Sequence, residues 1–479
     1  MAATRISTRK VIAILFVLYF SGTLCLADSK NQSINPDELP PPKDIVANMG
    51  SYNTREERFP SIEQRVKVYT SNWYTPPCDD YEEGFLRYQW NGGDDDSWPT
   101  LQVHQLVHHP LVNASVPILD IESIVEPDML FLLDPEIMVH CANYSYDEDV
   151  EDVEQDPIAQ RIKFRQNMRM YCVDVQDLML PALAHVQLEK QNTKMPPTLL
   201  QFGDNKQSHV HGDVMVPHIK KFRSAVNQPE DLDAVTKDGC LKKTRPTLDT
   251  AHGNERFQPL VWKLATDRHY RHLYEVYRAD TVWSKKMNMA VFRGQLTGSR
   301  EGYDKTLSDE ENCYNLKRCR LVYNHANSTL IDASLTSTRG RLPDILNGVT
   351  LVGEKVRLNY LLQFKGIIMI EGNDVASGLK WALLSQSVVL MPPPKHTSWA
   401  MEELLQPWVH YIPLDDFATN VEERMQWIVD HDEEARRISE RASLWMEDLI
   451  FHPDAAEDDR LIQEEILRRY QSHFREQKR

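Results

Sequence analysis

Short apolar runs alternate with segments of helical periodicity in the second half of the chain. The runs "MAVFRG" (289–294), "GIIMIEG" (366–372) and "SVVLM" (387–391) predict short buried strands, because nearly every position in them is apolar. Between the last two runs, "SGLKWALLSQ" has the spacing of a helix. Strand, helix and strand in this order predict parallel strands joined by a right-handed crossover, and hence an α/β fold.

The pattern continues on both sides of this unit. The run "TLLQFGD" (198–204) predicts another buried strand, and residues 423–450 and 458–474 carry the period of long helices with mixed charge. In "PPPKHTSWAMEELLQPWVHYIPL" (392–414), a Pro-rich connection precedes an expected short helix capped by Thr397 or Ser398. The strand "WVHYIP" is expected to follow it.

The first 27 residues have the pattern of a targeting segment. Arg5, Arg9 and Lys10 precede the apolar run 11–27, which is short for a full membrane span. A cleaved signal peptide and a type II signal anchor both fit. The polar, Pro-rich residues 28–100, a stem followed by an irregular stretch, favour the anchor, which would then be the chain's contact with a membrane.

Cysteines and glycosylation sequons agree with a secretory-pathway chain. Apart from Cys25 in the targeting segment, six cysteines remain, and we expect a disulfide between Cys313 and Cys319, whose loop is short. Asn-x-Ser/Thr sequons occur at Asn31, Asn113, Asn143 and Asn327. The C-terminus "REQKR" lacks a retrieval signal, so the Golgi is favoured over the endoplasmic reticulum.

The charge of the chain bears on its partners. The formal net charge is −17 and the isoelectric point about 5.5. Binding along a phosphate backbone needs clustered Lys and Arg to displace counterions. Nucleic acid is therefore not an expected partner.

A cluster of small polar residues lies where the strand "GIIMIEG" hands over to the helix. Glu371, Gly372, Asn373 and Asp374 fall at the carboxyl end of the strand, the edge at which parallel sheets bind ligands. Gly372 permits close backbone approach, and Asn373 or Asp374 is expected to cap the helix. Free N–H groups of the first turn would then face a phosphate, with Lys380 supplying positive charge.

A second loop has residue types that suit a diphosphate. Arg293 and Gly294 end the strand "MAVFRG", and "QLTGSR" places Gly298, Ser299 and Arg300 directly after it. Guanidinium groups bind phosphate oxygens bidentately, so two arginines that flank a Gly-rich turn predict an anion site.

The order of these motifs resembles a known family. "VFRG", "EGND" and "QPWVHYIPL" are similar to blocks of the lumenal family that contains protein O-glucosyltransferases and fungal capsule xylosyltransferases, and the similarity extends over residues 287–427. The resemblance implies a GT-B glycosyltransferase, in which two Rossmann-like lobes enclose a nucleotide-sugar cleft. It implies inversion, a UDP-sugar donor, and neither a cofactor nor a metal. The acceptor lobe would be 101–286, the donor lobe 287–450, and 451–479 a final helix of the kind that crosses back to the first lobe.

The resemblance also assigns roles to residues. Arg293 and Gly294 fall in the family's donor loop, followed by Arg300. Its nucleotide-binding turn corresponds to the segment with Glu371, Gly372, Asn373, Asp374, Ser377 and Lys380. Family members carry an Arg after the Ser of that turn, where this chain has Gly378 and Leu379. Diphosphate binding is then expected to depend on Arg293, Arg300 or Lys380.

The family's general base is an aspartate that follows an apolar strand of the N-terminal lobe. Asp204, at the end of "TLLQFGD", occupies that setting. It would take the proton from the acceptor hydroxyl as oxygen attacks the anomeric carbon, and the acceptor would be a protein or a glycan. The alternative for Asp204 is a turn residue whose side chain makes an Asx hydrogen bond.

Other residue groups support rival functions. Asp94 and Asp96 form an Asp-x-Asp arrangement that could hold a metal under a diphosphate, but no apolar strand precedes it. His209 and His211, and the looser group His104, His108 and His109, lack a third ligand at suitable spacing. The missing Arg leaves a catalytically degenerate binding protein as a further alternative. No nucleophile elbow or His-Glu-x-x-His motif is present to support a hydrolase.

Overall fold

The computed structural model describes the C-terminal half of the chain almost continuously and shorter segments before it. The described residues are 54–70, 86–90, 100–109, 114–119, 130–132, 199–201, 210–211, 214–215, 219–225, 260–264, 266–298, 302–472 and 474–476. The predicted targeting segment, Asp94, Asp96, Asp204, His209 and Arg300 lie outside them. Among the helices in these ranges, none is both long and apolar enough to cross a membrane.

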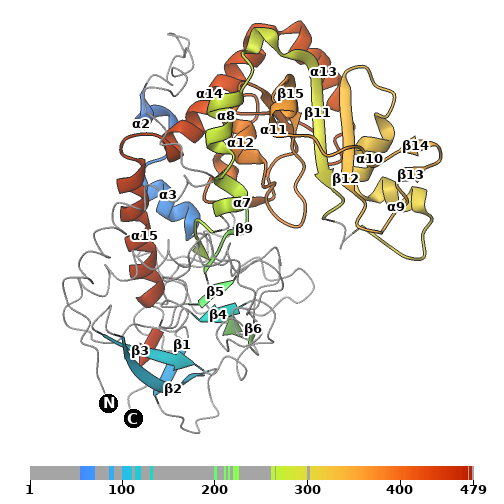
Figure 1. Cartoon of the computed structure of the whole chain (residues 1–479). Helices are drawn as coiled ribbons and strands as arrows, with labels where there is room; N and C mark the ends of the chain where they lie inside the picture. Colours follow the sequence, from blue (N-terminus) through green and yellow to red (C-terminus); the bar gives the residue numbers. More distant parts are fainter. Residues whose placement is uncertain are drawn as a thin grey trace, which may run out of the picture. The chain divides into compact units, whose positions relative to one another are not determined.

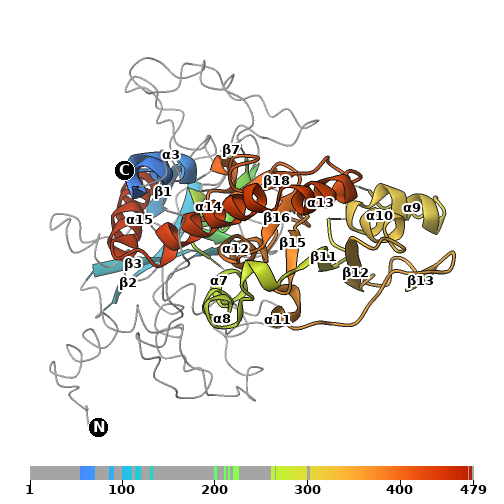
Figure 2. The ribbon, with the colours of Figure 1, turned by 90° about the horizontal axis from the view of Figure 1, so that it is seen from above.

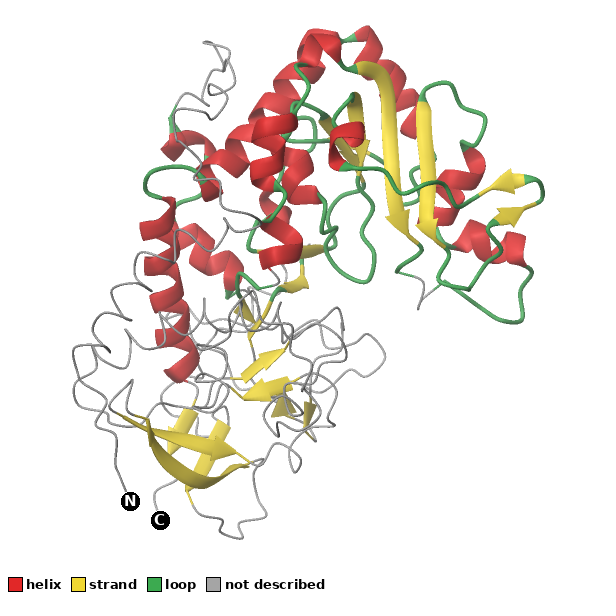
Figure 3. Cartoon of the chain, viewed as in Figure 1, coloured by secondary structure: helices red, strands yellow, loops and turns green. Residues whose placement is uncertain are grey.

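A five-stranded parallel sheet organises the C-terminal half (Figure 1). Its strand order is β12-β11-β15-β16-β18, and all four pairings are parallel. The strands are β11 (Met287–Gln295), β12 (Ile331–Ser337), β15 (Phe364–Ile368), β16 (Val388–Met391) and β18 (Ile412–Pro413). The long arrows of β11 and β12 lie side by side in Figure 3. The three apolar runs of the sequence are thus confirmed as parallel strands.

Both faces of this sheet are buried, which explains why its strands read as continuous apolar runs. Val291, Ile367 and Val389 pack into one hydrophobic cluster with α12 and α14. Neighbouring residues of the same strands, such as Phe292 and Leu390, pack into a second cluster with α10 and α13. The helices of this region are α7 (Thr266–Tyr270), α8 (Leu273–Ala279), α9 (Asp309–Asn315), α10 (Lys317–Asn324), α11 (Leu358–Leu361), α12 (Leu379–Leu384), α13 (Val421–Asp430) and α14 (Asp432–Ile450), with the 3-10 turns η6 (Trp283–Lys285) and η7 (Glu402–Leu404).

The predicted disulfide is present. Cys313 in α9 and Cys319 in α10 are bonded, and both are fully buried in the second cluster. The bond ties together α9 and α10, the two helices between β11 and β12.

The described residues also form several smaller sheets. One has the order β10-β8-β5-β4 and another β19-β1-β2-β3. Their strands are β1 (Leu86–Trp90), β2 (Thr100–His109), β3 (Ala114–Leu119), β4 (Leu130–Leu132), β5 (Leu199–Gln201), β8 (Ile219–Lys220), β10 (Leu260–Val261) and β19 (Phe474–Glu476). Two-stranded pairs are β6 (Val210–His211) with β7 (Val214–Met215), β13 (Ile345–Leu346) with β14 (Val349–Thr350), and β9 (Phe222–Ser224) with β17 (His396–Ser398). Within the predicted strand 198–204, the described residues Leu199–Gln201 form β5.

Two N-terminal helices dock against the C-terminal helix. They are α2 (Arg55–Arg58) and α3 (Ile62–Tyr69), and the C-terminal helix is α15 (Ala455–Ser472). Arg65 of α3 is buried and bonds Asp459 of α15 at 2.7 Å, while the Tyr69 hydroxyl donates to the Trp399 carbonyl at 2.8 Å. The predicted final helix is thus present, and β19 after it pairs with β1.

Two local predictions are wrong. Residues 396–398 form β17, which pairs with β9, and not a helix cap, because the short turn η7 that follows has Met401 at its N-cap. Only Ile412–Pro413 of "WVHYIP" is a strand, since Trp408 has a left-handed backbone with φ of 63°. The helical pattern 423–450 is interrupted at His431, so α13 and α14 follow one another in a row (Figure 2).

Candidate functional site

Two loops predicted from the sequence meet at the carboxyl edge of the sheet. β11 and β15 are hydrogen-bonded neighbours, so the loop after β11 and the turn after β15 emerge side by side. The Gly298 N–H donates to Asn373 Oδ1 at 2.9 Å and joins them directly. The Asn373 side chain therefore tethers the neighbouring loop and does not cap α12. That helix starts at Leu379, and its N-cap, Gly378, makes no side-chain cap hydrogen bond.

Glycines make the contact between the loops possible. Gly298 has a φ of +77°, and a Cβ there would lie 2.8 Å from the carbonyl oxygen of Gly372. A Cβ on Gly372 would lie 2.3 Å from the Thr297 hydroxyl. Both positions need a hydrogen in place of a side chain, Gly298 for its backbone angle as well.

Replacing Gly298 with alanine is expected to separate the two loops. Its positive φ should cost about 1–2 kcal/mol and the clash with Gly372 a further 1–3 kcal/mol or so of the free energy of unfolding. Gly348→Ala is the matched control, since Gly348 has a φ of +83° and open space around it. Denaturant unfolding of both variants measures the difference, and equal losses would contradict this packing.

Arg318, which the sequence analysis did not identify, bonds both loops. Its Nη1 donates to the Gln295 carbonyl at 2.7 Å and to Thr297 Oγ1 at 2.8 Å, and its Nη2 donates to the Ile370 carbonyl at 2.7 Å. One guanidinium in the first turn of α10 thus fixes the ends of β11 and β15. The sequence showed only "LKRCR", in which three basic residues are indistinguishable.

Burial and, to a smaller extent, nearby charges shift the pKa of Arg318. Burial lowers the pKa of Arg318 to about 10, an effect that Asp374 opposes and Arg268 reinforces. The guanidinium therefore remains charged at neutral pH. Asp374 is itself buried and paired with Lys221, with 2.6 Å between Oδ2 and Nζ.

Arg293, which is predicted to lie in the donor loop, forms an ion pair with Asp332. Its Nη1 donates to the carbonyls of Phe292 and Asp332, and its Nη2 donates to both carboxylate oxygens of Asp332, all at 2.8–2.9 Å. Of the five N–H groups of a guanidinium, only the one at Nε is then left. Arg293 links β11 to β12, and both of its Nη atoms are used in these bonds and are not left for a phosphate. Gly294 beside it leaves room for Arg318, because a Cβ on Gly294 would lie 3.4 Å from Nη1 of Arg318.

Lys380, the other cation predicted at the diphosphate, is also paired with a carboxylate. It is fully buried, and its Nζ lies 2.6 Å from Oε1 of the buried Glu402. Burial tends to raise the pKa of Glu402, but the Lys380 ammonium and hydrogen bonds from Ser398 more than offset this, so the pKa lies below its usual value. Lys380 therefore neutralises Glu402 inside the protein. Ser377 lies half-buried in the turn before α12.

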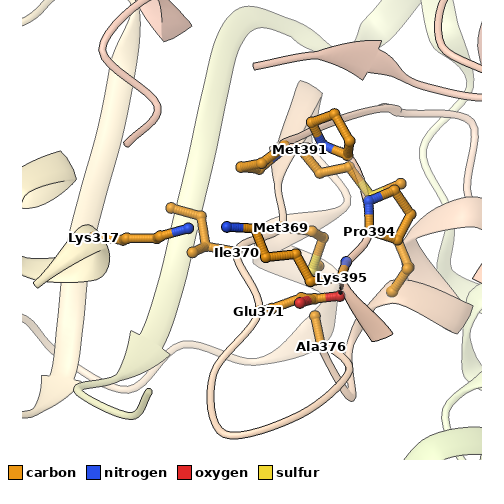
Figure 4. Close-up of a pocket in the computed structure, with 11 residues that line it drawn as sticks. Lys317, Met369, Ile370, Glu371, Ala376, Met391, Pro394 and Lys395 are labelled. Carbon is orange, nitrogen blue, oxygen red and sulfur yellow. Dashed lines mark hydrogen bonds between the residues drawn. The ribbon is translucent and has the colours of Figure 1, made fainter. Parts of the chain in front are cut away.

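A small pocket lies beside the meeting loops (Figure 4). Its volume is about 30 Å³, enough for one or two water molecules. It is lined by Lys317, Met369, Ile370, Glu371, Ala376, Leu379, Met391, Pro392, Pro393, Pro394 and Lys395.

Two lysines that sequence reasoning missed reach toward each other at this pocket (Figure 4). The Asp416 carboxylate lies 2.8 Å from the Lys395 ammonium and 3.6 Å from that of Lys317. Burial, and then the neighbouring Lys395 charge, lowers the pKa of Lys317, whereas the hydrogen bond to Asp416 raises that of Lys395. The two ammonium groups share the Asp416 carboxylate, and the Glu371 carboxylate in the pocket lining also acts on Lys395. Lys317 and Lys395 are the cations of this pocket and the candidates to bind an anion there.

No group of three or more His, Cys, Asp or Glu side chains gathers as a metal site within the described ranges. His104, His108 and His109 lie in β2 and His211 in β6. The other candidate metal ligands, Asp94, Asp96 and His209, lie outside the described residues. The same holds for Asp204 and Arg300.

Comparison with known proteins identifies the segment that carries this site. Residues 268–452 match glycosyl transferase family 90. The O-glucosyltransferase LpsA of Dichelobacter nodosus is 42% identical over 85 residues, 18% of this chain and 27% of that protein. Protein O-glucosyltransferase 2 of Danio rerio is 33% identical over 162 residues, 33% of this chain and 28% of that protein. Protein O-glucosyltransferase 1 of Homo sapiens is 26% identical over 199 residues, 39% of this chain and 44% of that protein.

These matches confirm the resemblance seen in the sequence: residues 268–452 are similar to glycosyl transferase family 90. The matched stretch spans less than half the length of each of these relatives. Residues 268–452 contain the loop after β11, Arg318, the turn after β15 and the pocket lysines Lys317 and Lys395.

Proposed function

We propose that this protein is an inverting glycosyltransferase that moves a hexose or pentose from a UDP-sugar to a hydroxyl of a protein or polysaccharide. The observation that carries the proposal is the junction of the two loops by Asn373 and Arg318 at the carboxyl edge of a parallel sheet. That edge is where α/β sheets bind nucleotides, and it lies in the family 90 segment. The names of the relatives support transfer of glucose.

In this proposal the donor lies across the mouth of the pocket, because the pocket itself has room only for water. The ammonium groups of Lys317 and Lys395 would bind the diphosphate and stabilise it as the leaving group. Arg318 acts through the loops that it fixes. The C-terminal sheet would be the donor lobe of a GT-B enzyme of the secretory pathway, with the Golgi favoured.

Asp204 completes the proposed reaction as the general base. It would accept the proton of the acceptor hydroxyl while the hydroxyl oxygen bonds to the anomeric carbon and the bond to the UDP oxygen breaks. The reaction would need no metal, since the leaving charge is met by side chains.

Release of UDP from UDP-glucose and UDP-xylose by the purified full-length protein, with and without EDTA, tests this function. Activity that survives EDTA and is lost in Asp204→Asn, while UDP binding stays unchanged, is expected. Loss with EDTA would favour a metal-dependent enzyme. Retained activity in Asp204→Asn would reject that base.

A degenerate nucleotide-sugar binding protein is the second candidate. The specific observation in its favour is that Arg293 and Lys380, the cations expected at the diphosphate, are both held in internal ion pairs. It predicts UDP binding without turnover of any donor.

A further inference from the structure

Glu371, which lines the pocket, forms a hydrogen-bonded pair with the histidine that follows Lys395. Oε2 of Glu371 lies 2.8 Å from Nδ1 of His396. Oε1 of Glu371 accepts the backbone N–H groups of Lys395 at 3.0 Å and His396 at 3.1 Å. One carboxylate thus fixes both the backbone and the ring of His396.

The surroundings of His396 hold its ring in one orientation. His396 lies in β17, which pairs antiparallel with β9 opposite Ser224. The ring of Phe222 meets the imidazole edge to face, with 5.5 Å between the ring centres. Only 7% of the His396 side chain is exposed, so the ring has little freedom to turn.

The other ring nitrogen, Nε2, is left as an acceptor. A carboxylate only accepts hydrogen bonds, so in the neutral imidazole the proton resides on Nδ1 and Nε2 presents its lone pair. Within the described part of the chain, Nε2 of His396 has no hydrogen-bond partner. Nε2 of His269 is fully buried without a partner, whereas Nε2 of His396 is not among the fully buried, unpaired atoms of the described residues.

We propose that His396, oriented by Glu371, binds the donor by accepting a hydrogen bond from a hydroxyl of the nucleotide sugar through Nε2. This assignment rests on the proposed function. Glu371 and the adjacent Lys395 line the pocket whose lysines would bind the diphosphate, and hydroxyls of the ribose and of the transferred sugar flank a diphosphate on either side. A hydroxyl of either sugar can donate a hydrogen bond to the lone pair of Nε2.

Glu371→Gln separates this role from a structural one. Oε1 of residue 371 accepts two backbone N–H groups, so the glutamine carbonyl must take that place and its NH₂ must face Nδ1. The imidazole then carries its proton on Nε2 and becomes a donor. The shape and the hydrogen bond of the pair are kept, while the acceptor is lost.

His396→Asn and His396→Gln form the complementary pair of variants. Asparagine places an amide near Nδ1 and keeps the contact with Glu371, whereas glutamine reaches the position of Nε2. We expect about tenfold weaker binding of UDP-glucose for His396→Asn and Glu371→Gln, as for one lost hydrogen bond, and less than threefold for His396→Gln. If His396 had only a structural role, His396→Gln would weaken the binding of UDP-glucose most, because it breaks the pair with Glu371.

Calorimetric titration of the full-length variants with UDP and with UDP-glucose makes the test, and melting temperatures check that each variant folds. A loss seen with both ligands assigns the ribose hydroxyl, and a loss seen only with UDP-glucose assigns the transferred sugar. Wild-type binding in both His396→Asn and Glu371→Gln would overturn the role of His396 alone. Failure of the wild-type protein to bind UDP would overturn the proposed function, and this assignment with it.

Discussion

Replacing Lys380 with methionine is expected to lower the free energy of unfolding by about 3–5 kcal/mol at pH 7. The reason is that Glu402 would remain as a buried carboxylate without its counter-ion, although Ser398 would still donate to it. Both side chains of the pair are almost completely buried, so water cannot replace the ammonium. Denaturant unfolding monitored by circular dichroism measures the loss.

The double variant Lys380→Met with Glu402→Gln is the control for this interpretation. Its neutral amide can keep hydrogen bonds to Ser398, so it should be more stable than Lys380→Met alone. Equal losses in the two variants would mean that the unpaired charge is not the cause.

The pH dependence gives a second check on the same pair. In the wild-type protein the pKa of Glu402 lies below its usual value, so the stability from the pair is present above the pKa of the unfolded chain and is lost only as the pH falls through the lower folded value. Without Lys380, burial should raise the pKa of Glu402, and protonation then removes the unpaired charge. The deficit of Lys380→Met should therefore shrink between pH 7 and pH 5.

Replacing Arg318 with alanine is expected to cost about 3 kcal/mol or more and to abolish donor binding. Hydrogen bonds from a charged group contribute about 1.5–3 kcal/mol each, and Arg318 makes three to the two loops. Their loss frees the carbonyls of Gln295 and Ile370 and lets the ends of β11 and β15 separate.

Two substitutions delimit this effect. Arg318→Lys keeps the charge but cannot span both loops, so it should recover little. Arg437→Ala removes an exposed arginine, whose partner Glu433 lies 3.5 Å away, and should cost less than about 1 kcal/mol. Unaltered UDP binding by Arg318→Ala would show that the loops do not need this junction.

The local pattern of the sequence predicts the framework of the C-terminal half. Runs such as "GIIMIEG" and "SVVLM" are apolar throughout because both faces of their strands are buried, and this property is visible without coordinates. The pairing of Cys313 with Cys319 follows from their short separation. The meeting of the loops after β11 and β15 follows from their places at strand ends.

The partners of charged side chains could not be predicted in the same way. Lys380 pairs with a residue 22 positions away, Arg293 with one 39 positions away, and Arg318 bonds a carbonyl 52 positions away. A basic residue beside a Gly-rich turn has the same sequence signature whether it faces a phosphate or a buried carboxylate. Only the packing of the sheet separates Arg293 and Lys380, which are internally paired, from Lys317 and Lys395, which line the pocket.

Calorimetric titration of UDP into wild-type protein and into the variant Lys317→Met with Lys395→Met tests the proposed donor site most directly. The matched control is Lys67→Met with Lys355→Met, which removes two exposed lysines elsewhere. Binding to wild type and control that weakens at least about tenfold in the pocket variant is the expected result, as each tenfold corresponds to about 1.4 kcal/mol. Equal affinity in all three proteins would contradict a diphosphate site at this edge of the sheet.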